Sequence, residues 1–576
     1  MRPDKLNIVL CWHMHQPWYR DGLDGDYRLP WVYLHALKDY SDMAAHLEQH
    51  PDMKVVVNFS PILLEQLDDY GQQLGNYLKQ GTPMQDRLLN LLAGVEAIPS
   101  DRDGRCRLLR ECQRCHAPTM IHPYPVFQRL LSMVGATDND HAGVSGKQFK
   151  YPMAYLSDQY FLDLLTWYHL VWLGESLRTQ AEVKALFKQT ELFDADKRLS
   201  LLHIMHRCIT QVIPRYRALA ERGQIELSMT PYMHPIIPLL QDFNNMRCSL
   251  PDAPAPQAET YPQGEDRARW HMEKGLALFE KYFGRKPQGV WLSEGGVSES
   301  AVRLLDEMGI RWNASGEGVW RNSMYLSGYK GEDVDNKRSL FMPYRQAGQT
   351  TRTFFRDDGL SDLIGFKYST WHSYDAVADF CQHLENIAIF LGDNAGQQVV
   401  SIILDGENAW EYYPHNAWHF LEALYNALSH SDSFKMTHFS EVAETLPSHD
   451  LPKLCAGSWV YGSFSTWIGS EDKNRGWDYL AKAKQAYDEV IASGQLSAEQ
   501  QEQASHQLGV CEGSDWFWWF GDYNSSDSVS DFEKLYRLQL TKLYSLLGLE
   551  KPAYLDIPLS KGGGQAENAG TMRRNT

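Results

Sequence analysis

Two carboxylic acids stand where buried strands are expected to end, and acids in such positions can act as nucleophiles or exchange protons. Asp405 follows the apolar, mostly β-branched run 399–404, and Glu294 follows the run 288–293. Runs of this kind are typical of strands that a parallel sheet buries on both faces. An acid at the carboxyl end of such a strand points into the mouth of an α/β barrel, where catalytic groups sit. A pair of acids there provides the ingredients of glycoside hydrolysis, in which one carboxylate attacks the anomeric carbon and the other transfers a proton.

The polar residues after the run 399–404 also have a structural explanation. In the sequence Asp405-Gly406-Glu407-Asn408, either Asp405 or Asn408 would serve as the N-cap of a following helix. Several other expected strands end in polar residues as well, and this repetition favours a site at one rim of a barrel. The two interpretations predict different surroundings for Asp405, a helix end or a cleft.

Two histidines follow the first expected strand, the run 7–12. His13 and His15 would face the same side of a strand that continues past Trp12, because side chains alternate with period two. A pair so placed can bind a metal ion or hydrogen-bond a polar ligand. A metal site would also need a nearby aspartate, and none follows this strand at close spacing. The pair followed by Gln-Pro at a strand end favours a site role, as a metal ligand or as a partner of a polar ligand, over a buried structural histidine.

The elements that would position these residues form a repeated strand and helix pattern. The strand-like runs are residues 7–12, 54–59, 224–230, 288–293, 310–314, 351–355 and 399–404. Helical patterns lie between most of them, and the range 155–223 is helical almost throughout. Alternating strands and helices predict a parallel sheet, and strands with polar ends predict a barrel with its site at one rim. We expect this catalytic barrel, with helical insertions, to span residues 1–445.

Beyond residue 445 the pattern changes to helices alone. Periodic apolar residues predict helices at 477–493, 498–508 and 529–546, which would form a C-terminal helical bundle over 446–559. Between the last two lies the aromatic run Trp516-Phe517-Trp518-Trp519-Phe520. This run is either a core plug or a set of side chains offered to a cleft, and the flanking glycines and aspartates disfavour a helix interior. The glycine-rich polar tail 560–576 is predicted to be disordered.

The composition excludes several classes of partner. The chain has 576 residues and a formal net charge of −18, which argues against nucleic acids and anionic membranes because both reward basic surfaces. No segment approaches the ~18 consecutive apolar residues of a membrane span, and the closest, residues 161–173, contains Asp163 and His169. The first residues run into a stretch that is too short and too β-like for a signal peptide. We expect a soluble, cytoplasmic protein whose oligomeric state is not specified by these features.

Nine cysteines, an odd number spread along the chain, do not resemble a disulfide framework. Three of them, Cys106, Cys112 and Cys115, lie in the polar insertion 97–120, which we expect to be irregular. The segment Cys112-Gln113-Arg114-Cys115-His116 fits the haem-attachment pattern, but that chemistry requires export and a haem pocket. A zinc site would need a second cysteine or histidine pair. Reduced, structural cysteines are the favoured interpretation.

Five segments, in the same order, resemble the five conserved regions of glycoside hydrolase family 57. They are His13-Met14-His15-Gln16-Pro17, then Gly223-Gln224-Ile225-Glu226 with Thr230 and His234-Pro235, then Trp291-Leu292-Ser293-Glu294, then Asp405-Gly406-Glu407-Asn408, and finally Ser514-Asp515-Trp516-Phe517-Trp518-Trp519. Each segment is a weak signal alone, but five in order across most of the chain are specific. The resemblance implies an α/β fold, a distorted (β/α)7 TIM-like barrel followed by a helical domain. It also implies action on α-glucans with retention of configuration and without a metal or other cofactor.

Carried over by position, the resemblance implies that Glu294 is the nucleophile and Asp405 the general acid/base. The substrate-binding positions that it implies are His13, His15, Gln16, Glu226, His234, Trp291, Glu407 and Asp515, with Trp516 and Trp518 or Trp519 reaching the cleft from the helical domain. Trp410 is a further candidate on the acceptor side. The segment 355–366 looks most like the α-amylase and amylopullulanase branch of the family and less like the branching enzymes. Its residues Arg356 and Asp357 are further candidate substrate-binding residues. One departure is Ser293-Glu294-Gly295, where many members place alanine before the acid and cysteine or a similar small residue after it.

The resemblance leaves the reaction open between hydrolysis and transfer. Hydrolysis of α-1,4 or also α-1,6 linkages, 4-α-glucan transfer and branching share a glycosyl-enzyme and differ in the acceptor. A metal-dependent deacetylase or mannosidase on a related barrel is a weaker alternative, as is a non-catalytic glucan-binding protein. The presence of both Glu294 and Asp405 argues against a non-catalytic protein, since losing either acid is the simplest route to inactivity. The expected partner is an α-glucan or malto-oligosaccharide.

Overall fold

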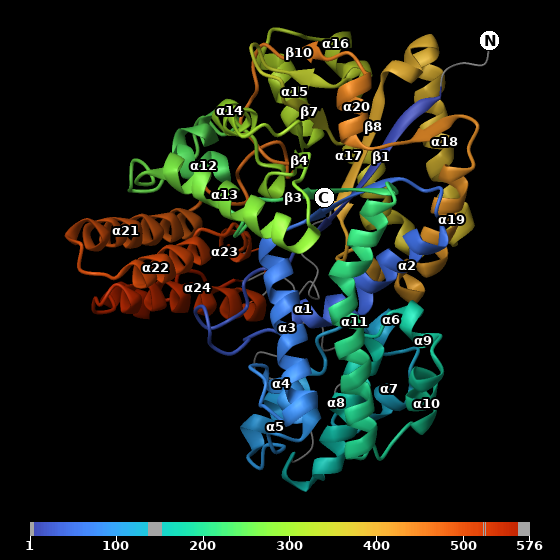
Figure 1. Cartoon of the computed structure of the whole chain (residues 1–576), viewed down its shortest axis with the longest axis vertical. Coiled ribbons are helices and arrows are strands. Elements are labelled where there is room, and N and C mark those ends of the chain that lie inside the picture. The colour runs from blue at the N-terminus through green and yellow to red at the C-terminus, as the bar shows by residue number, and fades with distance from the viewer. Residues whose placement is uncertain (1–4, 136–152, 522, 525, 563–576) are drawn as a thin grey trace.

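A mostly parallel sheet organises the chain, and Figure 1 shows it in a computed structural model that describes residues 5–135, 153–521, 523–524 and 526–562. The strands are β1 (Leu6–Met14), β2 (Val55–Phe59), β3 (Ile225–Met229), β4 (Gly289–Val290), β5 (Trp312–Ser315), β6 (Tyr344–Arg345), β7 (Arg352–Phe355), β8 (Val399–Asp405), β9 (Phe434–Met436) and β10 (His449–Asp450). Each of the seven predicted runs overlaps one of these strands. The short strands β6, β9 and β10 were not predicted, because two or three residues do not establish a period.

The strands are arranged in the order β10-β6-β7-β5-β4-β3-β2-β1-β8, and β9 pairs with the start of β1. The pairs along this path are parallel except for β6 with β7. A bridge between Arg356 and Ser401 joins the end of β7 to β8, so the two sides of the curled sheet meet. The predicted α/β class is confirmed, and the architecture is a distorted (β/α)7 barrel.

The helices that follow the barrel strands lie outside the sheet. They include α3 (Pro61–Gln80), α11 (Ala195–Glu221), α13 (Gly264–Phe283), α14 (Glu299–Glu307), α15 (Glu317–Leu326), α18 (Ser373–Leu391) and α19 (Trp418–Ser429). The helix α20 (Phe439–Thr445) instead contributes side chains to the interior of the curled sheet. The expectation of an irregular segment at 97–120 is wrong, because α5 (Arg102–Glu111) and α6 (Ala117–Met120) form there. Asp101 caps α5 by accepting a hydrogen bond from the backbone N–H of Gly104.

Beyond the barrel, α21 (Glu471–Ser493), α22 (Ala498–Cys511), α23 (Asp515–Trp519) and α24 (Ser526–Leu546) gather on one side of the molecule, at the left of Figure 1. The aromatic run forms the short helix α23, contrary to the expectation that its flanks disfavour a helix. Its rings pack on α24, as Trp519 does on Phe532. The predicted disordered tail falls mostly on residues 563–576, which lie outside the described residues. Within the part of the chain that the structure describes, no helix has the length and apolarity to cross a membrane.

The interior of the curled sheet holds its own core, separate from the core between sheet and helices. Its residues are Val9, Cys11, Val56, Trp291, Trp312, Ala314, Phe354, Val399, Ile403, Phe439 and Val442. On β1 and β8 these residues alternate with ones that face the helices, as a period of two requires. The next inward positions are His13 and Asp405, which are register partners. The sheet therefore brings this histidine and this acid to the same end of its interior.

Candidate active site

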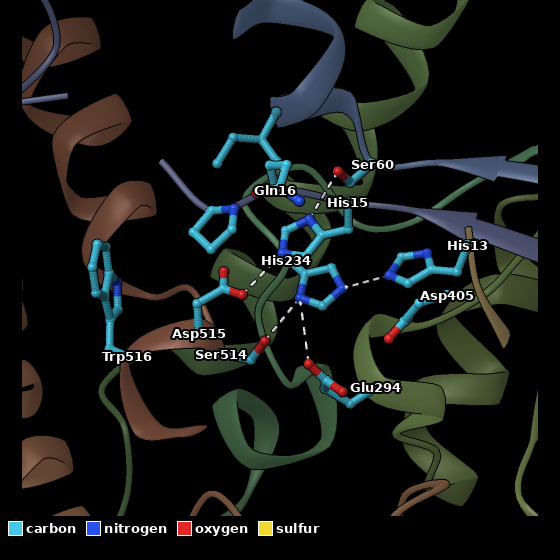
Figure 2. Close-up of polar contacts among 12 residues, drawn as sticks. His13, His15, Gln16, Ser60, His234, Glu294, Asp405, Ser514, Asp515 and Trp516 are labelled. Atoms are coloured by element: carbon cyan, nitrogen blue, oxygen red, sulfur yellow. Dashed lines mark hydrogen bonds and ion pairs between the residues drawn. The ribbon is translucent and has the colours of Figure 1, made fainter. Parts of the chain in front are cut away.

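Three histidines gather where β1 and β3 end: His13 near the end of β1, His15 just after β1, and His234 beyond β3 (Figure 2). The Nε2 atoms of His13 and His234 are 3.3 Å apart, and the rings of His15 and His234 stack with their centroids 3.7 Å apart. His234 adopts a φ of 59°, a conformation that is uncommon outside glycine and that often marks functional sites. The sequence predicted all three histidines as site residues, and the structure brings them together.

Residues at the end of β2 orient the two histidines of the first strand. Asn58 Oδ1 lies 2.7 Å from His13 Nδ1, and Ser60 Oγ lies 2.9 Å from His15 Nδ1. Thr230 Oγ1 donates to the same oxygen of Asn58 at 2.8 Å. Sequence reasoning missed Asn58 and Ser60 as site residues, although a polar Asn58 inside the apolar run Val55–Phe59 was a usable signal.

The helical region completes the cluster from the other side (Figure 2). Ser514 Oγ lies 2.8 Å from His234 Nδ1, and Asp515 Oδ1 lies 2.9 Å from His15 Nε2. Ser514 lies in the connection between α22 and α23, and Asp515 is the first residue of α23. The cluster is therefore made jointly by the barrel and by the helices that follow it.

Burial keeps His13 and His234 neutral. The pKa of His13 is lowered to about 3. Burial is the main cause and the nearby His15 adds to it, while the hydrogen bond to Asn58 acts in the opposite direction. Burial and the other two histidines lower the pKa of His234 well below its ordinary value. At neutral pH these rings are thus hydrogen-bonding groups rather than cations, one ring donating and the other accepting at their shared contact.

Glu294 lies in the turn Ser293–Gly295 directly after β4, with a left-handed φ of 59°. Its side chain is 12% exposed, and Oε1 lies 3.9 Å from His234 Nδ1. Trp459 holds this acid twice: its indole Nε1–H donates to Oε2 at 3.0 Å, and its backbone N–H donates to the carbonyl of Glu294 at 3.1 Å. Sequence reasoning missed Trp459, which lies outside the five motifs, although its setting among glycines and serines resembles that of a loop aromatic at a cleft.

Asp405 is the last residue of β8 and stands opposite His13. Its Oδ2 accepts a hydrogen bond from Asn408 Nδ2 at 2.9 Å. Burial raises the pKa of Asp405, while the Asn408 hydrogen bond and the positive potential of His15 and Arg356 lower it to a smaller extent. A carboxyl group whose pKa is raised holds its proton more readily, which suits a general acid.

The two acids approach one cluster from distant parts of the sheet. β4 and β8 are separated by β3, β2 and β1 in the strand order. Glu294 faces His234, His234 contacts His13, and His13 is the register partner of Asp405. The curl of the sheet thus places an acid on each side of the histidines, an arrangement that can act on both sides of a bound sugar linkage.

One group of metal-type ligands in the described ranges comes close enough to share an ion. Its members, His15, His234 and Asp515, have ligand atoms within 4.8 Å of one another. The imidazole planes of His15 and His234 are stacked at 12°, so their in-plane lone pairs do not converge on one point. His15 Nε2 is also already paired with Asp515. The set fits hydrogen bonding to a polar ligand better than tetrahedral metal ligation.

Glu407 and Gln16 lie directly behind the cluster. Glu407 Oε1 accepts a hydrogen bond from the His15 backbone N–H at 3.3 Å and lies 3.4 Å from Gln16 Nε2. Both side chains are buried, and Glu407 is only 2% exposed. Burial, reinforced by the nearby Asp405, raises the pKa of Glu407 well above its usual range. The structure therefore brings these two predicted residues to the site, where they back His15.

Arg356, another predicted residue, lies beside the cluster but is engaged by protein groups. Its guanidinium donates to the carbonyl of Ile403 and forms ion pairs with Asp358 and Asp362. Its Cζ also lies 5.6 Å from the ring centroid of Trp459. Arg356 thus supports the indole that holds Glu294.

Other predicted sugar contacts lie away from the cluster. Glu226 points to the interior of the sheet from β3. Its register partner is Val56, which pairs with Cys11, so Glu226 lies one inward position deeper in the barrel than His13. There it accepts hydrogen bonds from Trp312 Nε1 and from the backbone N–H of Ser440. The side chain is buried by the inner core, so the structure does not offer it to a ligand.

Tryptophans predicted to contact sugar are mostly buried. Trp291 belongs to the inner core and packs edge-on to Trp459, and Trp410 packs on Trp12 and donates to the carbonyl of Gly406. Trp516 is 1% exposed and donates to the carbonyl of Val510. Figure 2 shows its ring turned away from the histidines.

The remaining predicted residues divide between surface and core. Trp519 is buried against Phe532, and Trp518 is partly exposed and packs on Trp467. Asp357 caps the helix Asp358–Asp362 by accepting a hydrogen bond from the N–H of Leu360. Of the aromatic run, Trp518 alone keeps a partly exposed ring, since the short helix α23 turns its neighbours into the helical core.

The fold and the site together define a carbohydrate-active enzyme of the α/β-barrel class, in which two acids meet at the barrel mouth. Residues 9–455 match the model of glycosyl hydrolase family 57. The chain therefore belongs to this family of retaining, α-glucan-active enzymes, as the five motifs predicted.

Solved structures with this fold carry several activities. The chain is 14% identical to a family 57 branching enzyme of Thermococcus kodakaraensis, covering 94% of this chain and 90% of that one with a TM-score of 0.54. It is 13% identical to the α-amylase AmyC of Thermotoga maritima, covering 94% and 93% with a TM-score of 0.55. A 4-α-glucanotransferase of Thermococcus litoralis is 14% identical over 94% of this chain and 60% of that one, with a TM-score of 0.50. No curated protein matches the chain by sequence.

Proposed function

We propose that the chain is an α-glucan hydrolase of the α-amylase or amylopullulanase type, with Glu294 as nucleophile and Asp405 as general acid/base. One observation carries this proposal: both acids lie on one histidine cluster, Glu294 at 3.9 Å from His234 and Asp405 in register with His13. Membership of family 57 supports an α-glucan as the substrate class. The segment 355–366 supports the hydrolase branch.

In the proposed reaction, Glu294 attacks the anomeric carbon while Asp405 gives its proton to the leaving oxygen. The resulting glycosyl-enzyme is released when Asp405 removes a proton from water, which then attacks the same carbon. The Trp459 indole fixes the carboxylate of Glu294 for the first step. The neutral His13 and His234 bind sugar hydroxyl groups without neutralising either acid.

The test is the product profile from a purified linear α-1,4 malto-oligosaccharide, with reducing ends and chain lengths followed together. We expect reducing ends to rise as chains shorten, and E294Q to show neither change. Redistributed lengths at constant reducing ends would assign 4-α-glucan transfer instead, and new α-1,6 branch points would assign branching. Unchanged substrate, with pullulan unchanged as well, would contradict the substrate class.

A further inference from the structure

A tight turn carries an exposed tyrosine beside the loop that contains Glu294. Ser463 donates its backbone N–H to the carbonyl of Val460 at 3.3 Å, which closes the turn around Tyr461 and Gly462. The side chain of Tyr461 is 56% exposed. Within the described ranges it forms neither a hydrogen bond nor a contact with another aromatic ring. The ring of Tyr461 is therefore open to a ligand.

The backbone of this turn has a conformation that tyrosine rarely adopts. The φ angle is 56° at Tyr461 and 62° at Gly462, so both central residues of the turn are left-handed. Turns of this kind favour glycine, asparagine and aspartate, because most other side chains clash with the backbone in the left-handed region. Strained residues that the surrounding structure holds in place are concentrated at functional sites. A large aromatic residue at this corner carries a backbone cost that asparagine would largely avoid.

The turn packs closely on the rim of the barrel. A Cβ atom on Gly316, directly after β5, would lie 2.6 Å from the Cα of Trp459. A Cβ atom on Gly318, in the first turn of α15, would lie 2.8 Å from the Cα of Gly462. Neither distance leaves space for a side chain. Asn322 Nδ2 of the same helix donates to the carbonyl of Gly462 at 3.2 Å. The barrel therefore holds the turn in one position.

The same segment is fixed to the loop that contains the proposed nucleophile. Trp459 donates its indole Nε1–H to Glu294 Oε2 at 3.0 Å and its backbone N–H to the Glu294 carbonyl at 3.1 Å. Gly457 and Val297 exchange two further backbone hydrogen bonds, at 2.8 and 3.1 Å. Consecutive Cα atoms are about 3.8 Å apart, so the Cα of Tyr461 lies within about 7.6 Å of that of Trp459. An exposed aromatic ring is thus held on a fixed support close to Glu294.

We propose that Tyr461 forms an outer sugar subsite, where its ring stacks on a glucose unit beyond the unit that Glu294 attacks. The C–H groups on one face of a glucose ring pack on an aromatic ring, and the tyrosine hydroxyl can hydrogen-bond a sugar hydroxyl. A ring whose backbone is already fixed loses little conformational entropy when the ligand binds. This inference rests on the proposed function, because it takes Glu294 as the nucleophile and an α-glucan as the ligand.

Two consequences distinguish such a subsite from an ordinary surface side chain. An outer subsite contributes only when the glucan is long enough to reach it, so the affinity for short chains should not depend on Tyr461. Replacing Tyr461 with asparagine removes the ring but suits the left-handed backbone better. The variant Y461N should therefore lose affinity for long chains while its thermal stability stays the same or increases.

The test measures the binding of maltose and maltoheptaose by isothermal titration calorimetry, with the full-length E294Q variant as the parent so that no turnover occurs. We expect Y461N to raise the Kd of maltoheptaose about tenfold and to change the Kd of maltose by less than about twofold. Y461F keeps the ring and should bind maltoheptaose nearly as the parent does. The matched control is Y374N, at a tyrosine of α18 that is 71% exposed, and it should change neither Kd.

An unchanged Kd of maltoheptaose in Y461N would overturn the subsite. A lower unfolding temperature in Y461N, with weaker binding of both sugars, would overturn it too, because Tyr461 would then support the fold of the site. Binding to E294Q does not depend on whether the wild type hydrolyses or transfers glucans. Failure of the hydrolase assignment is therefore read from the products, and failure of the subsite from the Kd values. A parent that binds no maltoheptaose would overturn both proposals.

Discussion

Two buried clusters of histidine and carboxylate in this chain have opposite electrostatics. The first is the barrel mouth, with His13, His234 and Asp405. The second lies between α13 and α22, where Glu512 accepts hydrogen bonds from Arg267 Nη2 and His271 Nε2, each at 2.7 Å. Burial tends to raise the pKa of both carboxyl groups. The pKa of Asp405 stays raised, whereas Arg267 and His271 lower the pKa of Glu512 to about 2.

The difference comes from one guanidinium. Burial raises the pKa of any carboxyl group, but Arg267 pairs directly with Glu512 and overrides that effect. At the barrel mouth, Arg356 forms its ion pairs with Asp358 and Asp362. The direct hydrogen-bond partner of Asp405 is the uncharged side-chain amide of Asn408. The second cluster therefore keeps a fixed charge while the first can exchange protons. Glu512 also immediately precedes the segment that supplies Ser514 and Asp515, so the fixed cluster positions the reactive one.

The strongest test of the reactive cluster is E294Q, which keeps size and hydrogen bonding but removes the nucleophile. We expect turnover to fall by more than about a thousandfold, since no other group replaces the attacking carboxylate. Steady-state kinetics measures this, with glucan binding and thermal unfolding as controls that should change little. Strong residual activity would remove Glu294 from the nucleophile's role.

D405N tests whether the second acid of the mouth really exchanges protons. We expect turnover of natural glucans to fall about a hundredfold or more, and activated aryl glycosides to lose least because their leaving groups need no proton. The raised pKa of Asp405 also predicts that wild-type activity declines as pH rises through that value, when the proton is lost. Equal losses on both substrates, or an unchanged alkaline limb in D405N, would contradict the assignment.

R267M tests the fixed cluster by leaving Glu512 buried without its cation. We expect the free energy of unfolding to fall by about 3–5 kcal/mol, measured by urea denaturation. The matched control is R269M on the same helix, whose partner Glu307 is exposed, and its cost should be under about 1 kcal/mol. Similar costs for the two variants would show that burial does not distinguish the pairs.

The same variant carries a pH signature with a definite sign. Because the folded pKa of Glu512 is depressed, its contribution to stability is fully present above the ordinary glutamate range and is lost as pH falls through about 2. In R267M the free energy of unfolding should therefore depend less on pH in the acid range than it does in the wild type. Activity should fall too, since the segment of Ser514 and Asp515 loses its anchor.

The smallest effect is expected for W459F, which keeps an aromatic ring beside Arg356 but removes the indole donor to Glu294. Loss of one hydrogen bond to a charged group predicts a decrease in kcat of about tenfold, with KM little changed. W371F, at a partly exposed tryptophan on the outer surface, is the control and should be neutral. An unaltered kcat in W459F would mean that the indole of Trp459 does not position Glu294 for attack.

Much of the barrel could be predicted from local pattern. Runs of apolar residues marked each of the main strands, and period two correctly aligned His13 with the interior face of β1. The same alternation places the side chain of Glu226 on the interior face of β3. Its register partner is Val56, however, so Glu226 lies among the apolar residues of the inner core and not at the level of His13. Pattern identifies the face of a strand, but the register between strands decides the depth of a side chain.

Sequence alone determined which residues could do chemistry, because strand period, residue type and motif order are local properties of the chain. Tertiary structure decided which of them meet. Trp459 reaches Glu294 across 165 residues, and Ser514 reaches His234 across 280. The tertiary structure also turned Trp516 into the helical core. Such encounters depend on how a curled sheet packs against helices far along the chain, and no local period records that packing.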